Sequence, residues 1–366
     1  MTEPIYDSRD PRCKSPYGAA ASGAPVLLTL RPPRQEGYSR AQLTARFEAG
    51  EDEVRTLPMP WSGLDGDRDQ FSCVLDTGGY VGLVWYTFTL ERLDGKKSQQ
   101  LGPYQLTVYD GGEEVPAWFG EGMTYQIFPD RFRRTRIPDP AGMVGGRWVH
   151  TAWQEEPEYR PAANGEIRNR DFFGGTLAGI TSKLDDLKAL GVTTLYLCPI
   201  FESASNHRYN TADYTRIDPM LGTEADFRAL CAQARQRGMR VILDGVFNHT
   251  GSQSMYFNAD GYYPTLGAAQ SQDSPWYSWY RFHHWPDSYD SWWGIHTLPA
   301  VREECPSYVD YIIDHPDSIV RRWVRLGASG WRLDVADELP DWFIAKIRTA
   351  LEETDPEGFL IGEVWE

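Results

Sequence analysis

Three apolar segments of the sequence, each about as long as a β-strand, contain ionisable residues near their ends. Asp244 and His249 follow the first segment, Arg332 and Asp334 lie in the second, and Glu363 lies in the third. The two-residue period of a strand places Arg332 and Asp334 on one face. In a parallel barrel the carboxyl ends of the strands converge on one mouth, which is where active sites lie. We therefore expect these side chains to form one site.

Two carboxyl groups at such a mouth could cleave a glycosidic bond with retention of configuration. That reaction needs an ionised nucleophile and a protonated acid/base, about 5–5.5 Å apart. Arg332 is expected to hold Asp334 ionised by lowering its pKa, which makes Asp334 the nucleophile. Glu363 has Trp365 as a neighbour and no adjacent cation in the sequence, so it is the candidate acid/base. The alternative is a structural Arg–Asp pair at a strand end.

The elements that must position these residues follow Asp110. From there short apolar segments alternate with amphipathic ones, which predicts a parallel sheet, either doubly wound or closed into a (β/α)8 barrel. Strands are expected at residues 125–128, 193–199, 240–243, 331–335 and 359–364, and helices at residues 184–190, 224–237, 318–326 and 342–351. The candidate site residues lie at the ends of the last three strands or just beyond them.

The chain before this region predicts a β-sandwich domain at residues 25–117, preceded by an extended N-terminal arm at residues 1–24. Its strands are expected at residues 26–30, 42–47, 70–75, 83–90 and 104–109, with turns at Asp65-Gly66 and Asp94-Gly95. Strand 83–90 alternates clearly, and Trp85 lies on its less apolar face. That face could bind sugar, although an aromatic residue on a strand more often belongs to the core.

A segment at about residues 250–306 is too long for an ordinary connection and is predicted to be an insertion. It is dense in Trp and Tyr, and it follows the end of a strand. We expect it to form a substrate platform. The alternative is that its rings form a small core of their own.

Composition excludes several classes of function. The 366-residue chain has a formal net charge of −16 and no strong basic cluster, so nucleic acid and anionic membranes are not expected partners. Its five cysteines are scattered without metal-ligand spacing, which predicts reduced thiols. No signal peptide or membrane span is recognisable, so a cytoplasmic location is expected.

Three segments, residues 244–249, 330–338 and 362–365, resemble the first three signature regions of the α-amylase superfamily (glycoside hydrolase family 13), in the same order. Segments 125–132, 171–177 and 206–214 further resemble its neopullulanase, cyclomaltodextrinase and maltogenic-amylase branch. The resemblance covers about residues 121–366. It implies a (β/α)8 TIM barrel over residues 118–366, of which about the first five strand–helix units are present, after a carbohydrate-binding-module-like N-terminal domain.

The resemblance also implies a role for each candidate residue. Asp334 matches the nucleophile and Glu363 the acid/base, while Arg332 and Asp244 match the residues that support the nucleophile. Two further residues match family residues that bind the sugar in subsite −1. His249 matches a histidine that hydrogen-bonds the sugar, and Tyr209 matches a tyrosine that stacks under its ring. The loop at residues 133–146 lacks the calcium-binding pattern of the branch, and Thr176 replaces an Asp, so neither a metal nor a cofactor is expected.

The sequence departs from the family pattern in two places. The fifth signature is degraded at Ala300 and Arg302, where the family usually has Asn or Asp. The fourth signature, an Asn-His-Asp beyond the third, is absent. We therefore expect the sequence to be truncated after the third signature region, and the chain as given to be inactive alone because an open barrel exposes its strand edges.

The function implied is that of a retaining glycoside hydrolase that cleaves α-1,4 glucosidic bonds, with α-1,6 bonds as a second candidate linkage, in maltodextrins, cyclodextrins or pullulan. One alternative is an α-glucanotransferase with the same glycosyl-enzyme intermediate. A second is a non-catalytic, glucan-binding, amylase-like protein. The expected partner is an α-glucan, and a homodimer through the N-terminal domain is a further expectation.

Overall fold

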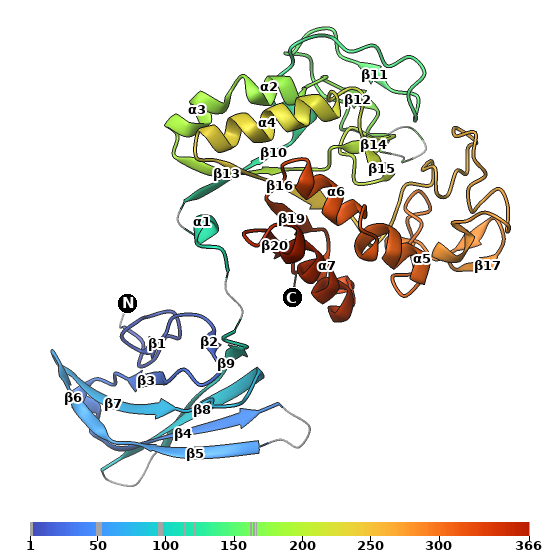
Figure 1. Ribbon diagram of the computed structural model, residues 1–366. Helices are drawn as coiled ribbons and strands as arrows, with labels where there is room; N and C mark the ends of the chain where they lie inside the picture. The colour runs from blue at the N-terminus through green and yellow to red at the C-terminus, as the bar shows by residue number, and fades with distance from the viewer. Residues whose placement is uncertain are drawn as a thin grey trace. The chain divides into compact units, whose positions relative to one another are not determined.

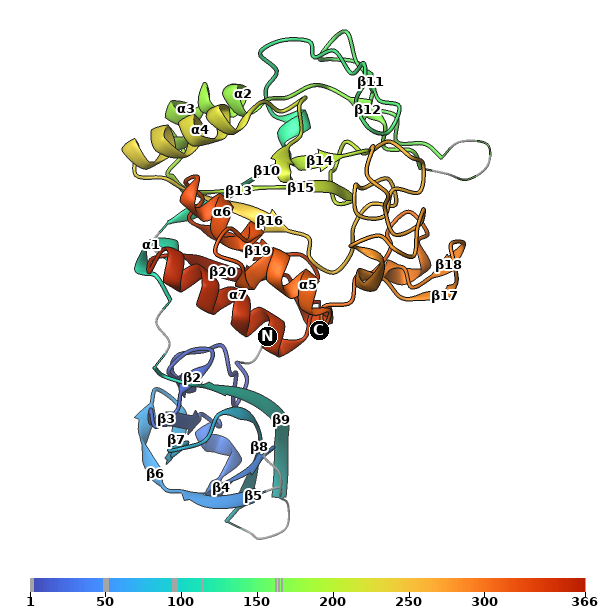
Figure 2. The ribbon, with the colours of Figure 1, turned by 45° about the vertical axis from the view of Figure 1, so that its right-hand side comes forward.

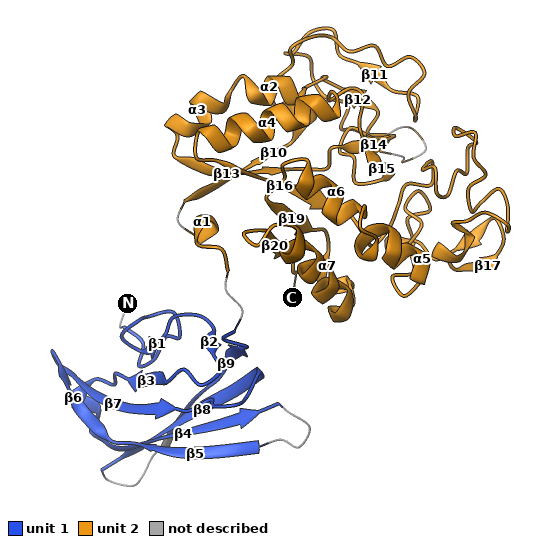
Figure 3. Cartoon of the chain, viewed as in Figure 1, with its two compact units in different colours: residues 1–114 blue, residues 115–366 orange. Residues whose placement is uncertain are grey.

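The computed structural model describes residues 3–48, 53–93, 98–112, 115–120, 122–161, 163, 165 and 167–365. The chain divides into two compact units, residues 1–114 and 115–366 (Figure 3). The sequence placed this boundary three residues later, between residues 117 and 118. Because each unit has its own core, each is described by itself.

Unit 1 consists of two sheets around one core (Figure 1). The first has the strand order β1 (Lys14–Ser15), β3 (Val26–Leu30), β7 (Arg68–Leu75) and β6 (Trp61–Asp65). The second has the order β2 (Ala20–Ala21), β9 (Ser98–Tyr109), β8 (Gly82–Arg92), β4 (Tyr38–Phe47) and β5 (Glu53–Met59). Strands β5 and β6 were not expected, because most of their side chains are at least partly exposed and their sequences show no apolar alternation.

The alternation predicted for β8 is confirmed. Its buried side chains, each 0% exposed, are Val84, Tyr86, Phe88 and Leu90. Trp85 on the opposite face is half-buried, and its indole N–H donates to Glu48 Oε1 at 2.9 Å, so this ring is not part of the core. Asp65 pairs with Arg68, so the expected turn at Asp65-Gly66 closes a tight hairpin. The expected turn at Asp94-Gly95 lies outside the described residues.

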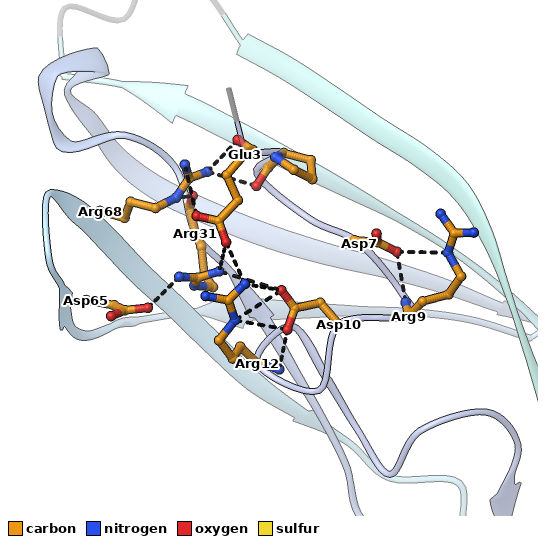
Figure 4. Close-up of polar contacts among 9 residues, drawn as sticks. Glu3, Asp7, Arg9, Asp10, Arg12, Arg31, Asp65 and Arg68 are labelled. Atoms are coloured by element: carbon orange, nitrogen blue, oxygen red, sulfur yellow. Dashed lines mark hydrogen bonds and ion pairs between the residues drawn. The ribbon is translucent and has the colours of Figure 1, made fainter. Parts of the chain in front are cut away.

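Residues 3–24 do not form an extended arm, so that expectation is wrong for the described part of the segment. The side chain of Tyr6 is buried in the core of unit 1, where its hydroxyl lies 2.7 Å from the hydroxyl of Tyr86. Arg31 binds Glu3 at 2.9 Å, and Arg68 donates to the carbonyl oxygen of Glu3 at 3.0 Å (Figure 4). The Pro, Ser and Gly content suggested an extended segment, but buried and charged side chains attach it to the sheets.

Unit 2 is built on five parallel strands that neighbour one another in sequence order (Figures 1 and 2). They are β10 (Met123–Ile127), β13 (Val192–Leu197), β16 (Arg240–Gly245), β19 (Gly330–Leu333) and β20 (Phe359–Gly362). The helices are α1 (Ala117–Gly120), α2 (Leu177–Thr181), α3 (Leu184–Ala189), α4 (Glu224–Gln236), α5 (Pro306–Val309), α6 (Ile319–Arg325) and α7 (Asp341–Thr354). Every strand and helix expected in this region is found within a few residues of its predicted bounds.

The helices bury their apolar faces in the same core as the strands. Helices α2, α3 and α4 lie together beside β10 and β13, and α6 and α7 lie beside β19 and β20 (Figures 1 and 2). Helix α4 begins with a capping box, in which Thr223 and Asp226 each bond the other's backbone N–H. Its buried residues, at helical spacing, are Phe227, Leu230, Cys231 and Ala234.

The strand register aligns the carboxyl ends of the last three strands. Gly245 pairs with Leu333, and Leu333 pairs with Gly362, and these are the final residues of β16, β19 and β20. The residues that follow therefore emerge at one edge of the sheet. Short two-stranded sheets lie in the connections: β11 (Trp148–Val149) with β12 (Asp171–Phe172), β14 (Phe201–Ser203) with β15 (Thr211–Ile217), and β17 (Phe282–His284) with β18 (Ser288–Tyr289).

Several rings of the aromatic insertion are buried, but they join the core of unit 2 and do not form a core of their own. Trp279 and Tyr280 are 2% and 3% exposed, and Tyr277 stacks on Phe282 with centroids 5.2 Å apart. Trp293, in contrast, is 77% exposed. In the part of the chain that the structure describes, no helix combines the length and the apolar character needed to cross a membrane.

Candidate active site

One guanidinium group connects the three strand ends. Nη1 of Arg332 donates to Asp244 Oδ1 at 2.9 Å and to Asp334 Oδ1 at 2.8 Å, and its Nη2 lies 2.5 Å from Glu363 Oε2. The strand register causes this convergence, because Asp244 and Arg332 are paired residues of neighbouring strands. The structure thus places the two candidate catalytic carboxyl groups, Asp334 and Glu363, on the same cation.

The backbone around these carboxyl groups is held by the extension of the sheet. Asp334 N donates to the carbonyl oxygen of Gly245 at 3.1 Å, and Glu363 N donates to that of Leu333 at 3.0 Å. Val335 N donates to Glu363 Oε2 at 3.2 Å. Val335 has φ 46° and ψ 54°, a left-handed conformation that a β-branched residue rarely adopts. Such strain persists where surrounding contacts over-determine the backbone, and it clusters at functional sites.

The environment of Asp334 is not the one that the sequence predicted. Burial raises its pKa to about 7, and the charge of Asp244 adds to the rise, while Arg332 lowers it without reversing the shift. Arg332 thus lowers the pKa of Asp334 as the sequence predicted, but the net shift is upward, so the expectation that a lowered pKa keeps Asp334 ionised is wrong. The physical reason is that three carboxyl groups share this cation, and Asp334 is only 6% exposed.

Asp244 is the most deeply buried of the three carboxyl groups and is 1% exposed. Its Oδ2 accepts hydrogen bonds from the hydroxyl groups of Tyr196 and Tyr209, the latter at 3.0 Å. Burial raises the pKa of Asp244, although Arg332 and these hydroxyl groups lower it. Tyr196, on β13, was missed by the sequence analysis. Its only signal was a hydroxyl-bearing residue close to the end of an apolar strand.

The two residues matched to sugar binding lie next to each other. His249 Nε2 donates to the carbonyl oxygen of Tyr209 at 3.1 Å. Burial lowers the pKa of His249 to about 4, so the ring is neutral near pH 7. Its Nδ1 has no hydrogen-bond partner among the described residues. Together with the contact between Tyr209 and Asp244, this pair brings all six candidate residues into one connected cluster.

No group of three or more His, Cys, Asp or Glu side chains within the described ranges is arranged to hold a metal ion. Thr176 caps the N-terminus of α2, where its hydroxyl accepts from Gly179 N at 2.9 Å. Asp130, nearby in unit 2, is 0% exposed and accepts from the backbone N–H groups of Phe173 and Gly174. These two residues therefore bind backbone and organise the loops.

Comparison with known proteins identifies the family of unit 2. The family model "Alpha amylase, catalytic domain" matches residues 126–366. An amylopullulanase of Thermoanaerobacterium saccharolyticum is 35% identical over 412 aligned residues, covering 98% of this chain and 32% of that protein. Neopullulanase 2 of Thermoactinomyces vulgaris is 31% identical, covering 96% of this chain and 59% of that protein.

A solved structure is also similar to this chain over most of its length. The type III pullulan hydrolase from Thermococcus kodakarensis superposes with a TM-score of 0.61 at 27% identity, covering 98% of this chain and 61% of its own. The chain thus spans between 32% and 61% of the length of these three proteins. The family fold, with its TIM-barrel catalytic domain, confirms the barrel class predicted from the resemblance. Given the match over residues 126–366, the chain belongs to the alpha-amylase catalytic-domain family.

Proposed function

We propose that this chain carries the nucleophile, Asp334, and the acid/base, Glu363, of a retaining glycoside hydrolase acting on α-1,4 and α-1,6 glucosidic bonds of maltodextrins or pullulan. The observation that carries the proposal is the contact of both carboxyl groups with Arg332, at 2.8 Å and 2.5 Å. A retaining mechanism needs its two carboxyl groups close together, and one shared guanidinium keeps them so. Relatives named neopullulanase and amylopullulanase support this substrate class.

The reaction has two steps. A carboxylate oxygen of Asp334 attacks the anomeric carbon while Glu363 protonates the glycosidic oxygen, which leaves with the shortened glucan. Glu363, now ionised, then takes a proton from water, whose oxygen attacks the same carbon and releases Asp334 as a carboxylate. Arg332 stabilises the charge on the carboxyl groups throughout. The neutral ring of His249 and the hydroxyl of Tyr209 are placed to contact the sugar at the reacting centre.

The finer architecture belongs to the same proposal. The five parallel strands of unit 2 correspond to the first five of the eight barrel strands, and the two sheets of unit 1 to a β-sandwich of the carbohydrate-binding-module type. The absence of a metal and a cofactor, the cytoplasmic location and the homodimer through the N-terminal domain stay predictions of the sequence.

Two substrates test the roles of the carboxyl groups. With pullulan or cyclodextrin, and in a form of the protein that carries the complete barrel, we expect Asp334→Asn and Glu363→Gln each to abolish cleavage. With maltosyl fluoride, whose leaving group needs no proton, Glu363→Gln should retain cleavage and Asp334→Asn should not. Equal behaviour of the two variants on the fluoride would refute the assignment of roles. Products that are only elongated chains would replace the hydrolase with an α-glucanotransferase.

A further inference from the structure

One face of strand β13 carries a tyrosine where the strand of a parallel sheet is usually apolar. Tyr196 pairs in register with the residue two positions before Asp244, so the side chains of Tyr196 and Asp244 lie on the same face of the sheet. Asp244 in turn pairs with Arg332 of β19. Leu195 and Leu197, the neighbours of Tyr196 in β13, belong to the other face and are buried in the core with the helices. Tyr196 therefore lies on the face of the sheet that carries the candidate active site.

The hydroxyl of Tyr196 helps to hold the charge of the buried Asp244. It donates to Asp244 Oδ2, and the hydroxyl of Tyr209 donates to the same oxygen at 3.0 Å. Nη1 of Arg332 donates to the other oxygen, Oδ1, at 2.9 Å. Burial raises the pKa of Asp244, while the charge of Arg332 and the hydroxyl of Tyr196 oppose this rise. Each of these donors thus favours the ionised form of Asp244.

The ring of Tyr196 contacts the cation that Asp244 shares with Asp334. The guanidinium carbon of Arg332 lies 5.8 Å from the centroid of the Tyr196 ring, a distance at which a cation is attracted to an aromatic face. Nη1 of Arg332 donates to Asp334 Oδ1 as well as to Asp244. Burial raises the pKa of Asp334, the charge of Asp244 adds to the rise, and Arg332 opposes it. Tyr196 thus touches both of the charged groups that act in opposite directions on Asp334.

The position of Tyr196 in its strand separates it from the reacting centre. Tyr196 lies within β13, whereas Asp334 and Glu363 follow the last residues of their strands. Substrates of parallel barrels bind beyond the carboxyl ends of the strands. Burial and the charge of Asp244 raise the pKa of Tyr196, so its hydroxyl keeps its proton and remains a donor. Tyr196 is therefore placed to act on the carboxyl groups and not on the sugar.

We propose that Tyr196 is a positioning residue of the candidate active site, in which its hydroxyl fixes Asp244 and its ring supports Arg332. Asp334 is the group on which both of them act. The role of Asp334 as the nucleophile rests on the proposed function, whereas the contacts of Tyr196 do not. An ionised Asp244 raises the pKa of Asp334, so a hydroxyl that stabilises the charge of Asp244 influences the proton on Asp334 without touching it. Tyr196 itself forms and breaks no bond in the reaction.

Carbon-13 NMR titration of the chain with labelled aspartate tests this role without an assay of activity. Tyr196→Phe keeps the ring against Arg332 and removes only the hydroxyl. Asp244 then loses one hydrogen bond to its charged form, so we expect its pKa to rise by about 1. The pKa of Asp334 should fall toward its value in Asp244→Asn, because a protonated Asp244 does not repel the charge of Asp334.

A second background shows whether Tyr196 acts through Asp244. In Asp244→Asn, the further change Tyr196→Phe should leave the pKa of Asp334 within about 0.3, because no carboxylate remains for the hydroxyl to hold. The matched control is Tyr308→Phe, which removes a buried hydroxyl that donates to the carbonyl oxygen of Phe247 at 2.6 Å. It should leave both pKa values unchanged. An unchanged pKa of Asp244 in Tyr196→Phe, or an equal shift of Asp334 in both backgrounds, would overturn the proposal.

Activity supplies a second readout, in a form of the protein that carries the complete barrel. With pullulan, we expect Tyr196→Phe to lower kcat about 10-fold and to change KM less than about 2-fold, because the hydroxyl orients Asp244 and Arg332 and does not touch the sugar. An unchanged kcat, or a loss confined to KM, contradicts the positioning role. Failure of the proposed hydrolase looks different. A parent that cleaves no glucan, but in which Tyr196→Phe raises the pKa of Asp244, would retain the positioning contacts without the catalytic function.

Discussion

Two buried clusters of arginine and aspartate in unit 2 use the same groups with opposite results. In the site cluster, Arg332 is shared by Asp244, Asp334 and Glu363. In the second cluster, which we call the loop cluster, Asp218 lies between Arg147 Nη1 at 2.8 Å and Arg208 Nε at 3.2 Å. The three side chains of the loop cluster are at most 1% exposed.

The pKa values of the carboxyl groups separate the two clusters. Burial alone would raise the pKa of Asp218, but the charges of Arg208 and Arg147 lower it below its ordinary value of 3.8. In the site cluster burial and Asp244 raise the pKa of Asp334 to about 7 despite Arg332. Burial is common to both, so the difference lies in the balance of charge: two cations for one carboxyl group, against one cation for three. The first balance suits a structural ion pair, whereas the second leaves Asp334 with a weaker preference for its ionised form.

This difference gives the clusters opposite effects on stability as pH changes. The lowered pKa of Asp218 means that its contribution is present above its unfolded pKa and is lost as pH falls through the folded value. The raised pKa of Asp334 means that its contribution is present below about 3.8 and is lost as pH rises through about 7.

The largest effect is expected from breaking the loop cluster. Asp218→Asn leaves the guanidinium groups of Arg147 and Arg208 buried without a counter-charge, so unit 2 should lose about 3–5 kcal/mol of unfolding free energy at pH 7. Urea unfolding followed by near-UV circular dichroism measures this loss. A change below about 1 kcal/mol would mean that the loop cluster does not stabilise the fold in this way.

The sequence could predict which residues lie together at the site. It could not predict how their shared contact with Arg332 affects the pKa of each carboxyl group. Regular spacing placed β16, β19 and β20 within a few residues of their observed bounds, and with them the residues that follow their ends. The direction of the pKa shift of Asp334 depends on Asp244, 90 positions away in the chain, and on the depth of burial. Neither quantity is visible in the two-residue spacing between Arg332 and Asp334.

Other features were missed for the same reason. The bonds from Trp292 and Trp293 to Glu338 span 46 and 45 positions, and neither end carries a sequence signal for the other. The N-terminal segment looked extended because its composition is rich in turn residues, whereas its attachment depends on the burial of Tyr6 and on Arg31. Local pattern predicts elements well, and it does not predict contacts that only the fold creates.

The next largest effect on the free energy of unfolding should be a gain, opposite in sign to the loss expected for Asp218→Asn. Asp334→Asn replaces a carboxyl group, whose ionisation the fold disfavours, with a neutral group of similar shape. At pH 8 the variant should be more stable than the parent by about 2–4 kcal/mol, from the pKa difference, and this gain should vanish toward pH 4. Urea midpoints at the two pH values measure it. A loss of stability at pH 8 would show that Arg332 dominates the site cluster after all.

A smaller effect tests the balance of charge directly. Asp244→Asn removes the second cause of the raised pKa of Asp334 and leaves Arg332 with two carboxyl groups instead of three. We expect the pKa of Asp334 to fall by about 1, as measured by carbon-13 NMR titration of labelled aspartate. Asp218→Asn is the control and should leave the pKa of Asp334 unchanged. An unchanged pKa in Asp244→Asn would mean that the charge of Asp244 does not contribute to the rise.

The smallest effect is expected at an ion pair of the same length on the surface. Arg237 Nε lies 2.7 Å from Asp185 Oδ1, a distance close to those in both buried clusters, but the Asp185 side chain is 81% exposed. Water and salt screen this pair, so Asp185→Asn should shift the thermal midpoint of unit 2 by less than about 1 °C in differential scanning calorimetry. A shift as large as that of Asp218→Asn would mean that contact distance alone determines the strength of these pairs. The expected ranking instead makes burial the condition under which charge balance matters, because only a desolvated carboxyl group responds strongly to the number of cations around it.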